Sequence, residues 1–411
     1  MNKQKLVVNG NRLRQTLEDF SHFGATNKQG VTRLALSKED LEARDYFKEQ
    51  CEAIGMQVTV DDLGVMYSRL EGKNPDEPAI YLGSHLDTVK KGGRFDGVLG
   101  VAAGLEVVRS FVEHDLQPEC PIVVVNFTNE EGARFEPSMM ASGVIAEKFD
   151  TDTMLKVRDS DGVNVREALE DIGYAGAVTN RLKNGKAFLE VHIEQGPILE
   201  SESLKIGAVE CVVGMGCYEI EIIGESNHAG TTPQHMRRDA LTAANRCMTA
   251  LHDELRKLDE SLVYTMGRFQ VFPNIHTVIP NRVVFSIEAR HQNEEVLERV
   301  QSIIKGVVRD TQLDCAHTMK KLWSRDTVWF NPELVELIEK SAQSLELPYK
   351  RMVSGAGHDA QFISTMMPTA MIFVPSAHGK SHDEDEYTSW EECENGVNLL
   401  LETVLELSGS S

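Results

Sequence analysis

The chain has 411 residues, of which 41% are hydrophobic and 26% are charged, so it can bury more than one hydrophobic core. Two domains are therefore expected. The formal net charge of −22 excludes the basic surface that nucleic-acid phosphates or an anionic membrane would need. We expect neither nucleic acid nor a membrane as a partner.

The start of the chain and its cysteines indicate the compartment. No apolar core of a signal peptide follows Met1, and no stretch approaches the ~18 apolar residues of a membrane span. The seven cysteines are odd in number and form no CxxC motif, which is typical of reduced thiols. A cytoplasmic protein is expected.

The first third of the chain alternates between helix-like and strand-like segments. Residues 37–54 have the pattern of a helix, with Ser37 as its N-cap and Gly55 as the residue that ends it. Alternation of this kind predicts an α/β domain whose sheet has parallel members and helices on both faces. The other segments are a strand pair at 56–72 with a turn at 61–64, buried strands at 79–83 and 122–127, and a helix at 98–114.

Two further strands and a last helix complete this domain. In the strand at 188–193 and the residue after it, Glu190, His192 and Glu194 lie on one face and apolar residues on the other, so His192 is expected on a polar face near the carboxyl end. Residues 371–374 form another apolar strand, and a helix opens at Ser389 and ends near Leu407.

Residues 209–327 differ in pattern from the segments on either side. Their order of elements is βαββαβ, which is the ferredoxin-like arrangement. We therefore expect a catalytic domain made of 1–208 and 328–411, with 209–327 inserted as a second domain. The expected elements of the insertion are strands at 217–224, 265–272 and 283–290, helices at 238–258 and 294–311, and a final strand.

Metal-type side chains follow the apolar strands of the first domain. In open α/β sheets, sites form outside the carboxyl ends of the strands, so these side chains can converge on one pocket. They are His85 and Asp87 after 79–83, Glu130 and Glu131 after 122–127, His192 at the end of 188–193, and His382 after 371–374.

This set is large enough for two metal ions. Asp96 lies in the glycine-rich segment GGRFDG, where the backbone can bring a carboxylate close, and it is the expected bridging ligand. His85 and His192 would complete one metal, and Glu131 and His382 the other. Imidazole and carboxylate ligands suit zinc, manganese, cobalt or nickel almost equally.

The remaining carboxylates have expected catalytic roles. Asp87 is placed to accept the second ring N–H of His85 and fix its tautomer. Glu130 is expected to stay off the metal and act as the general base, which takes a proton from the metal-bridged water and passes it to the leaving nitrogen. Taken alone, Asp87 could equally be a turn residue, and the Glu130–Glu131 pair could be a solvated surface.

Several motifs of the chain resemble those of a known family. They are GSHLDTV, GGRFDG, TNEEGARF, VHIEQGPILE, NHAGTTP, RRDAL, SGAGHDA and GKSHDEDEYTS. Together, over residues 12–408, they are similar to the amidase/hydantoinase/carbamoylase branch of the aminoacylase and carboxypeptidase-type dimetal peptidase clan. That branch includes N-carbamoyl-L-amino acid hydrolases, β-ureidopropionases and allantoate amidohydrolases.

The resemblance implies a homodimer with an aminopeptidase-like dimetal catalytic domain and an inserted lid and dimerisation domain. It implies the same five metal ligands and the same base. It also implies that Gln195 holds the ureido group and that His358 lines the site. By the same resemblance, His228 would reach the partner subunit's site and stabilise the oxyanion, and Arg290 would bind the substrate carboxylate.

The residues implied only by the resemblance also have simpler readings. His228 could cap the helix that follows Pro233, Arg290 could be a surface charge, and Gln195 could form a turn. One departure concerns the segment PNIHTVIPN, where related sequences commonly carry asparagine at the position of Thr277. With Asn274 nearby, Thr277 is expected to contact the substrate through a hydroxyl and to shift the specificity.

The expected substrate is a small-molecule ureido acid. The expected reaction converts an N-carbamoyl-L-amino acid to the L-amino acid, carbon dioxide and ammonia, with two divalent ions per subunit. Allantoate amidohydrolase and β-ureidopropionase are close alternatives, and aminoacylase or dipeptidase is more distant. A non-catalytic relative is disfavoured by the unliganded Glu130, and a single structural zinc is disfavoured because the ligands lack cysteine and exceed four.

Overall fold

A computed structural model describes residues 5–311 and 314–410. These residues form two compact units, each with its own core. Unit 1 comprises residues up to 210 and from 329 onward, and unit 2 comprises 211–328. The divisions predicted from the sequence were at 208/209 and 327/328. Within the described residues, no helix is long and apolar enough to cross a membrane.

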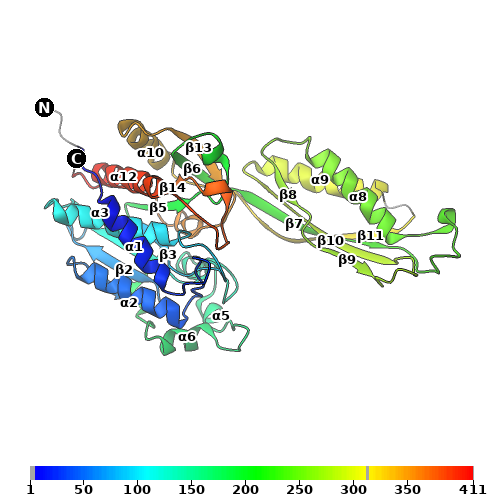
Figure 1. The fold of residues 1–411 in the computed structure, drawn as a ribbon, viewed down its shortest axis with the longest axis horizontal. Helices are drawn as coiled ribbons and strands as arrows, with labels where there is room; N and C mark the ends of the chain where they lie inside the picture. Colours follow the sequence, from blue (N-terminus) through cyan, green and yellow to red (C-terminus); the bar gives the residue numbers. More distant parts are fainter. Residues whose placement is uncertain (1–4, 312–313, 411) are drawn as a thin grey trace. The chain divides into compact units, whose positions relative to one another are not determined.

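Unit 1 is built on a mixed sheet in the order β1-β2-β4-β3-β5-β14-β6-β12, with β13 paired to β6 (Figure 1). The fold class expected from the sequence, a mixed-sheet α/β domain, is confirmed. The strands are β1 (Gln57–Val60), β2 (Met66–Leu70), β3 (Ile80–His85), β4 (Ile122–Phe127), β5 (Ala187–Ile193), β6 (Ile206–Val212), β12 (Val328–Trp329), β13 (Tyr349–Ser354) and β14 (Thr369–Val374).

The centre of this sheet is parallel. Strand β3 pairs in parallel with β4 and β5, and β5 pairs in parallel with β14. The outer pairings β1–β2, β2–β4 and β14–β6 are antiparallel. Because parallel strands end at the same edge of a sheet, β4, β3, β5 and β14 bring the segments that follow them to one edge.

Helices cover the sheet in layers. Helices α3 (Val98–Glu113) and α12 (Trp390–Leu407) contact each other and β5 (Figure 1). Helix α1 (Gly10–His22), which was not predicted, packs against both, and α3 is buried at every position from Val98 to Phe111. The other helices of unit 1 are α2 (Lys38–Glu52), α4 (Met140–Ile145), α5 (Thr151–Leu155), α6 (Val165–Asp171), α7 (Ile198–Ser201), α10 (Pro332–Ser344) and α11 (Ala360–Ile363), with 3-10 turns at Val178–Asn180 and Ala377–Gly379.

Helix starts in unit 1 follow the predicted caps. The side chain of Ser37 accepts the N–H of Asp40 at the start of α2. Ser389 and Glu392 form a reciprocal capping box at the start of α12. Each cap accepts hydrogen bonds from main-chain N–H groups that the first helical turn leaves free, so the starts of these helices could be predicted from the sequence.

Strand β5 is buried on both faces, the polar one included. Glu190 and His192 were expected on its polar face, and all seven residues from Ala187 to Ile193 are buried. Val191 on one face lies against α12, and on the other face the carboxylate of Glu190 accepts the main-chain N–H of Ala360 in α11. His192 therefore lies on a polar but fully covered face.

Unit 2 has the expected ferredoxin-like order, β11-β7-β10-β8, with every pairing antiparallel. The single strand predicted at 265–272 is wrong, because two short strands separated by 266–268 both pair with β10. The elements are β7 (Gly214–Ile223), α8 (Ala240–Leu255), β8 (Val263–Thr265), β9 (Phe269–Phe272), β10 (Arg282–His291), α9 (Glu294–Thr311) and β11 (Ala316–Arg325), with a 3-10 turn at Gln234–Met236.

One face of the unit 2 sheet forms its core. Alternate residues of β7 and β10, such as Ile220 and Phe285, are fully buried with apolar residues of α8 and α9. Most side chains of the other face are half-buried or exposed, and they include the ion pairs Arg268–Glu219 and Arg282–Glu221.

Candidate metal centre

The predicted donor side chains of unit 1 meet at the edge where the parallel strands end. His85 is the last residue of β3, and His192 lies one residue before the end of β5. Glu131 follows β4, and His382 follows β14. The strand predicted at 79–83 thus extends to His85, which places this imidazole on the sheet itself.

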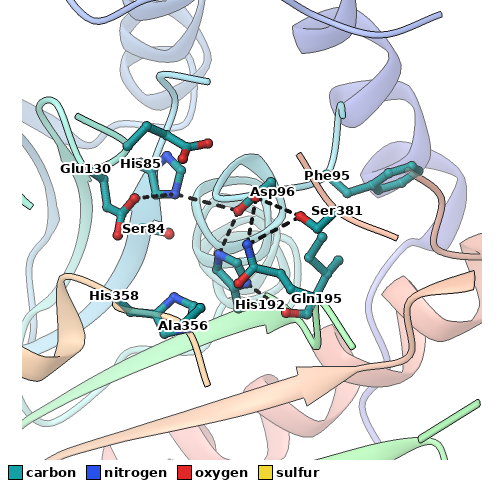
Figure 2. A network of polar contacts seen from close by, with 12 residues as sticks. Ser84, His85, Phe95, Asp96, Glu130, His192, Gln195, Ala356, His358 and Ser381 are labelled. Atoms are coloured by element: carbon teal, nitrogen blue, oxygen red, sulfur yellow. Dashed lines mark hydrogen bonds and ion pairs between the residues drawn. The ribbon is translucent and has the colours of Figure 1, made fainter. Parts of the chain in front are cut away.

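Asp96 lies at the centre of this group (Figure 2). One carboxylate oxygen, Oδ1, is 3.1 Å from Nε2 of His192 and 3.9 Å from Nε2 of His85. The other oxygen, Oδ2, is 3.3 Å from Nε2 of His382, which is also 3.4 Å from Oε2 of Glu131. The structure therefore brings together two donor groups, His85–Asp96–His192 and Asp96–Glu131–His382, which share Asp96.

A glycine allows the close approach of Asp96 and His85. Gly97 has a φ of 68°, and a Cβ at this position would lie 2.3 Å from Cε1 of the His85 ring. Gly97 is also the residue from which α3 starts. Any other residue would be strained in this conformation and would push the imidazole away from Asp96.

The orientation of the imidazoles is fixed by main-chain oxygens. Nδ1 of His85 lies 2.8 Å from the carbonyl oxygen of Asp87, and Nδ1 of His192 lies 2.8 Å from that of Ile193. Both rings thereby direct Nε2 toward Asp96, which suits metal ligands.

The role predicted for the Asp87 carboxylate is corrected by these contacts. The carboxylate accepts the main-chain N–H groups of Glu130 and Glu131, each at 3.3 Å, and does not reach the imidazole. Asp87 still orients His85, but through its own carbonyl group. The carboxylate instead fixes the segment that carries the two glutamates.

Carboxylates crowd the site and disfavour one another's charge. Burial, followed by the charge of Asp359, raises the pKa of Glu130 well above its usual range. Burial and the charge of Asp96 do the same to the pKa of Glu131, and burial and Asp40 raise the pKa of Asp87 to about 7. A cluster of buried carboxylates with raised pKa values fits a site that holds cations, which would favour the charged forms.

The imidazoles respond to Asp96 in different ways. Burial lowers the pKa of His85 to about 4, so this ring is neutral and its nitrogen is available as a ligand. Burial also lowers the pKa of His192, but the hydrogen bond with Asp96 and the charges of Asp96 and Glu190 together outweigh it and raise the pKa to about 9. For Asp96 itself, burial is outweighed by the hydrogen bonds with His192 and His382, and its pKa lies well below the usual range.

Glu130 belongs to neither donor group. Its side chain is 9% exposed, and Oε2 lies 3.6 Å from Nε2 of His85 (Figure 2). The carboxylate is thus beside the donors while remaining free to exchange a proton. The alternative reading of the Glu130–Glu131 pair as a solvated surface is wrong.

Gln195 and His358 also lie in the site. Gln195 has a φ of 57°, and its Nε2 donates to Oδ2 of Asp96 at 2.8 Å. The ring of His358 packs edge-on against that of His192 at 4.5 Å between centroids, and its Nε2 lies 2.9 Å from Oγ of Ser354. Four neighbours of the site were given no role from the sequence: the buried Glu190, Asp359 and Glu386, and the half-buried Ser381.

The other predicted site residues belong to unit 2. The segments of His228 and Thr277 lie side by side, because the N–H of Ala229 donates to the carbonyl of Thr277 and residues 228 and 278 form an isolated bridge. His228 does not cap a helix, since Nδ1 accepts the N–H of Gly230 and α8 is capped by Asp239. His228, Asn274 and Thr277 are exposed, and Arg290 forms an ion pair with Glu288 at 2.7 Å.

Comparison with known proteins establishes the family. The model of peptidase family M20/M25/M40 matches residues 81–406. The chain therefore belongs to this family, which includes dimetal hydrolases, and the resemblance described above is confirmed.

Curated relatives match the chain over almost its whole length. An N-carbamoyl-L-amino-acid amidohydrolase of Rhizobium meliloti is 36% identical, covering 97% of this chain and 96% of its own. An allantoate amidohydrolase of Bacillus subtilis is 34% identical, covering 99% and 100%. A crystal structure of an amidase of the hydantoinase/carbamoylase family from Burkholderia multivorans is 40% identical with a TM-score of 0.93, covering 98% of each chain.

Proposed function

We propose that the chain is a metal-dependent amidohydrolase that cleaves the ureido C–N bond of N-carbamoyl-L-amino acids. The observation that carries this proposal is the pair of donor groups that share Asp96, with the carboxylate of Glu130 beside them. Relatives named as N-carbamoyl-L-amino-acid amidohydrolases, at 33–36% identity, support the choice of substrate class.

The donor set fits two divalent cations. His85 and His192 would hold one, Glu131 and His382 the other, and Asp96 would bridge them, since each of its oxygens faces a different group. Bound there, two cations would lower the pKa of a water molecule and polarise the ureido carbonyl. Nitrogen and oxygen donors without cysteine suit zinc, manganese, cobalt or nickel.

Glu130 is proposed as the general base and acid. Its carboxylate would accept the proton of the attacking water and deliver it to the leaving nitrogen, so that this nitrogen departs as a neutral amine and not as an anion. The carbamate that remains would decompose to carbon dioxide and ammonia. Burial keeps the carboxylate away from bulk water, and the main-chain N–H of Glu130 is fixed by Asp87.

The remaining predicted site residues are proposed to orient the substrate. In unit 1, the amide of Gln195 and the ring of His358 are proposed to contact the ureido group. In unit 2, Arg290 is proposed to bind the carboxylate, with Asn274 and Thr277 beside it, and His228 to stabilise the developing oxyanion in the partner subunit of a homodimer. A guanidinium is suited to this task because it can bind a carboxylate through two parallel hydrogen bonds.

Two close alternatives use the same chemistry. Relatives named allantoate amidohydrolase are 33–34% identical over nearly the whole chain, so allantoate is a second candidate substrate, with N-carbamoyl-β-alanine a third. The chemistry is common to all three, because each contains a ureido group and a carboxylate. Thr277 in place of asparagine is the first residue to examine if the specificity is shifted.

The proposed compartment is the cytoplasm. All seven cysteines are buried, which suits reduced thiols in a reducing environment.

Ammonia release from the metal-reconstituted protein tests the proposal. The panel is N-carbamoyl-L-methionine, its D-enantiomer, N-carbamoyl-β-alanine and allantoate, with amine release from an N-acetyl-L-amino acid in parallel. Turnover of the L-carbamoyl compound that is lost with a chelator and restored by metal supports the assignment. Turnover of another panel member alone would assign the enzyme to that substrate class. If the protein binds two metals and turns over no member of the panel, the proposed function would be overturned.

A further inference from the structure

A second buried carboxylate, Glu386, holds the loop that carries Asp96. Glu386 is 4% exposed, and its Oε1 accepts the main-chain N–H groups of Phe95 and Asp96, each at 3.1 Å. Its Oε2 accepts the hydroxyl of Ser381 at 2.8 Å. The carboxylate therefore fixes the backbone of the loop at the residue proposed to bridge the two cations.

Ser381 connects this carboxylate to Asp96 directly. Its Oγ lies 3.1 Å from Oδ2 of Asp96 as well as 2.8 Å from Glu386. A hydroxyl has one proton, so it bonds only one of the two carboxylates at a time. When cations occupy Asp96, the hydroxyl is free to donate to Glu386 and to strengthen its hold on the loop.

The backbone of the loop is shaped to receive Glu386. A Cβ at Gly93 would lie 1.9 Å from Oε1 and 2.0 Å from Cδ of Glu386. Gly93 has no positive φ that would require a glycine, so the space taken by the carboxylate is the reason that a side chain is excluded here.

Glu386 also joins two of the three segments that supply the second donor group. Asp96 comes from the loop before α3, whereas Ser381, His382 and Glu386 come from the segment after β14. We propose that Glu386 is a positioning residue that fixes the Asp96 carboxylate against His382 and thereby sets the affinity for the cations. This role rests on the metal centre of the proposed function, and Glu386 itself belongs to neither donor group.

The test is a titration of metal-free full-length protein with zinc in competition with a chromophoric chelator. Glu386→Ala is expected to bind at least one of the two cations about 10–100-fold more weakly, the usual effect of removing a group that orients a ligand. Glu386→Gln keeps an acceptor for the two N–H groups and is expected to lose less. At saturating zinc, the alanine variant should regain much of its kcat, which a general loss of structure would not allow.

Gly93→Ala approaches the same contact from the opposite side. Its added methyl group displaces the carboxylate, so its zinc affinity is expected to fall at least about ten-fold, and the double variant should be no weaker than Glu386→Ala alone. Glu384→Ala is the matched control, because Glu384 lies on the same segment and bonds Thr26 instead of the Asp96 loop. Its zinc affinity should stay within about three-fold of wild type.

The outcomes separate this role from the metal centre itself. Wild-type protein that binds fewer than two cations would overturn the metal centre and this role with it. Wild-type protein that binds two, with Glu386→Ala and Gly93→Ala both within three-fold of its affinities, would overturn the role alone. If Glu386→Ala does not fold, the affinity of Gly93→Ala and its recovery at saturating zinc decide the question.

Discussion

The sheets of unit 1 and unit 2 provide different environments for polar side chains. Strands β4, β5 and β14 of unit 1 are buried at every residue, so both faces of the central sheet are covered. From Phe285 to His291, strand β10 of unit 2 alternates between buried and half-buried residues, because α8 and α9 cover only one face. A polar side chain therefore has a solvated environment on the second sheet and none at the centre of the first.

This difference decides how strongly the presence of a polar residue indicates a functional site. A buried imidazole or carboxylate is costly unless hydrogen bonds or a ligand compensate it. His192 in β5 is compensated by Asp96 and a main-chain oxygen, as expected at a site that holds cations. His228 and Thr277 of unit 2 are exposed and need no such compensation. Their environment alone therefore indicates no role, and their proposed roles need an experimental test. Four substitutions test this contrast.

The largest effect is expected at the covered edge of unit 1. Glu130→Gln should retain both cations, because Glu130 belongs to neither donor group, and should lose about 10²–10⁴-fold in kcat with its proton transfer. Metal content and steady-state kinetics measure the two properties separately. Glu170→Gln, an exposed position on α6, is the control. Near-normal turnover would remove Glu130 from the mechanism.

Removing one partner of a buried ion pair in unit 1 should have a large effect on the free energy of unfolding. Arg44 and Asp40 of α2 pair at 2.8 Å with side chains 1% and 0% exposed, and Arg44 also donates to the carbonyl of Gly64. Arg44→Met leaves the carboxylate buried without its partner, so the free energy of unfolding of unit 1 should fall by about 3–5 kcal/mol. Hydrogen exchange of amides in β3 and β4 measures it, and a loss below about 1 kcal/mol would contradict the argument.

His228→Ala tests whether an exposed residue of unit 2 takes part in catalysis. It is expected to lower kcat by about 10²–10³-fold, as for removal of an oxyanion donor, without loss of metal. Mixing it with Glu130→Gln protein should partly restore activity, because one site of each heterodimer would be intact. Absence of restoration in subunits shown to exchange would count against a site shared across the dimer.

The smallest effect is expected on the open face of unit 2. Arg282 and Glu221 pair at 2.6 Å with side chains 47% and 27% exposed. Solvent screens such a pair, so Arg282→Met should reduce the free energy of unfolding of unit 2 by only about 0.2–1 kcal/mol. Hydrogen exchange of amides in β7 and β10 is the measurement. A loss of unfolding free energy as large as that of Arg44→Met would contradict the proposed difference between the two sheets.

The sequence by itself determined the elements that local physics controls. Caps such as Ser37 and Ser389 marked helix starts, because a side-chain oxygen satisfies the free N–H groups of the first turn. Apolar runs predicted the parallel strands, and the donors that follow them were expected at one edge. The ferredoxin-like order of unit 2 followed from alternation, which survives where only one face of a sheet is covered.

Only the tertiary structure decided how these parts meet. The N–H of Asp96 bonds Glu386 across 290 residues of chain, and Gln195 and Ser381 also converge on Asp96. The main-chain oxygen of Asp87, rather than its carboxylate, orients His85. No local pattern encodes such contacts, because they depend on the order β4-β3-β5-β14, and that order is set by which buried faces pack together.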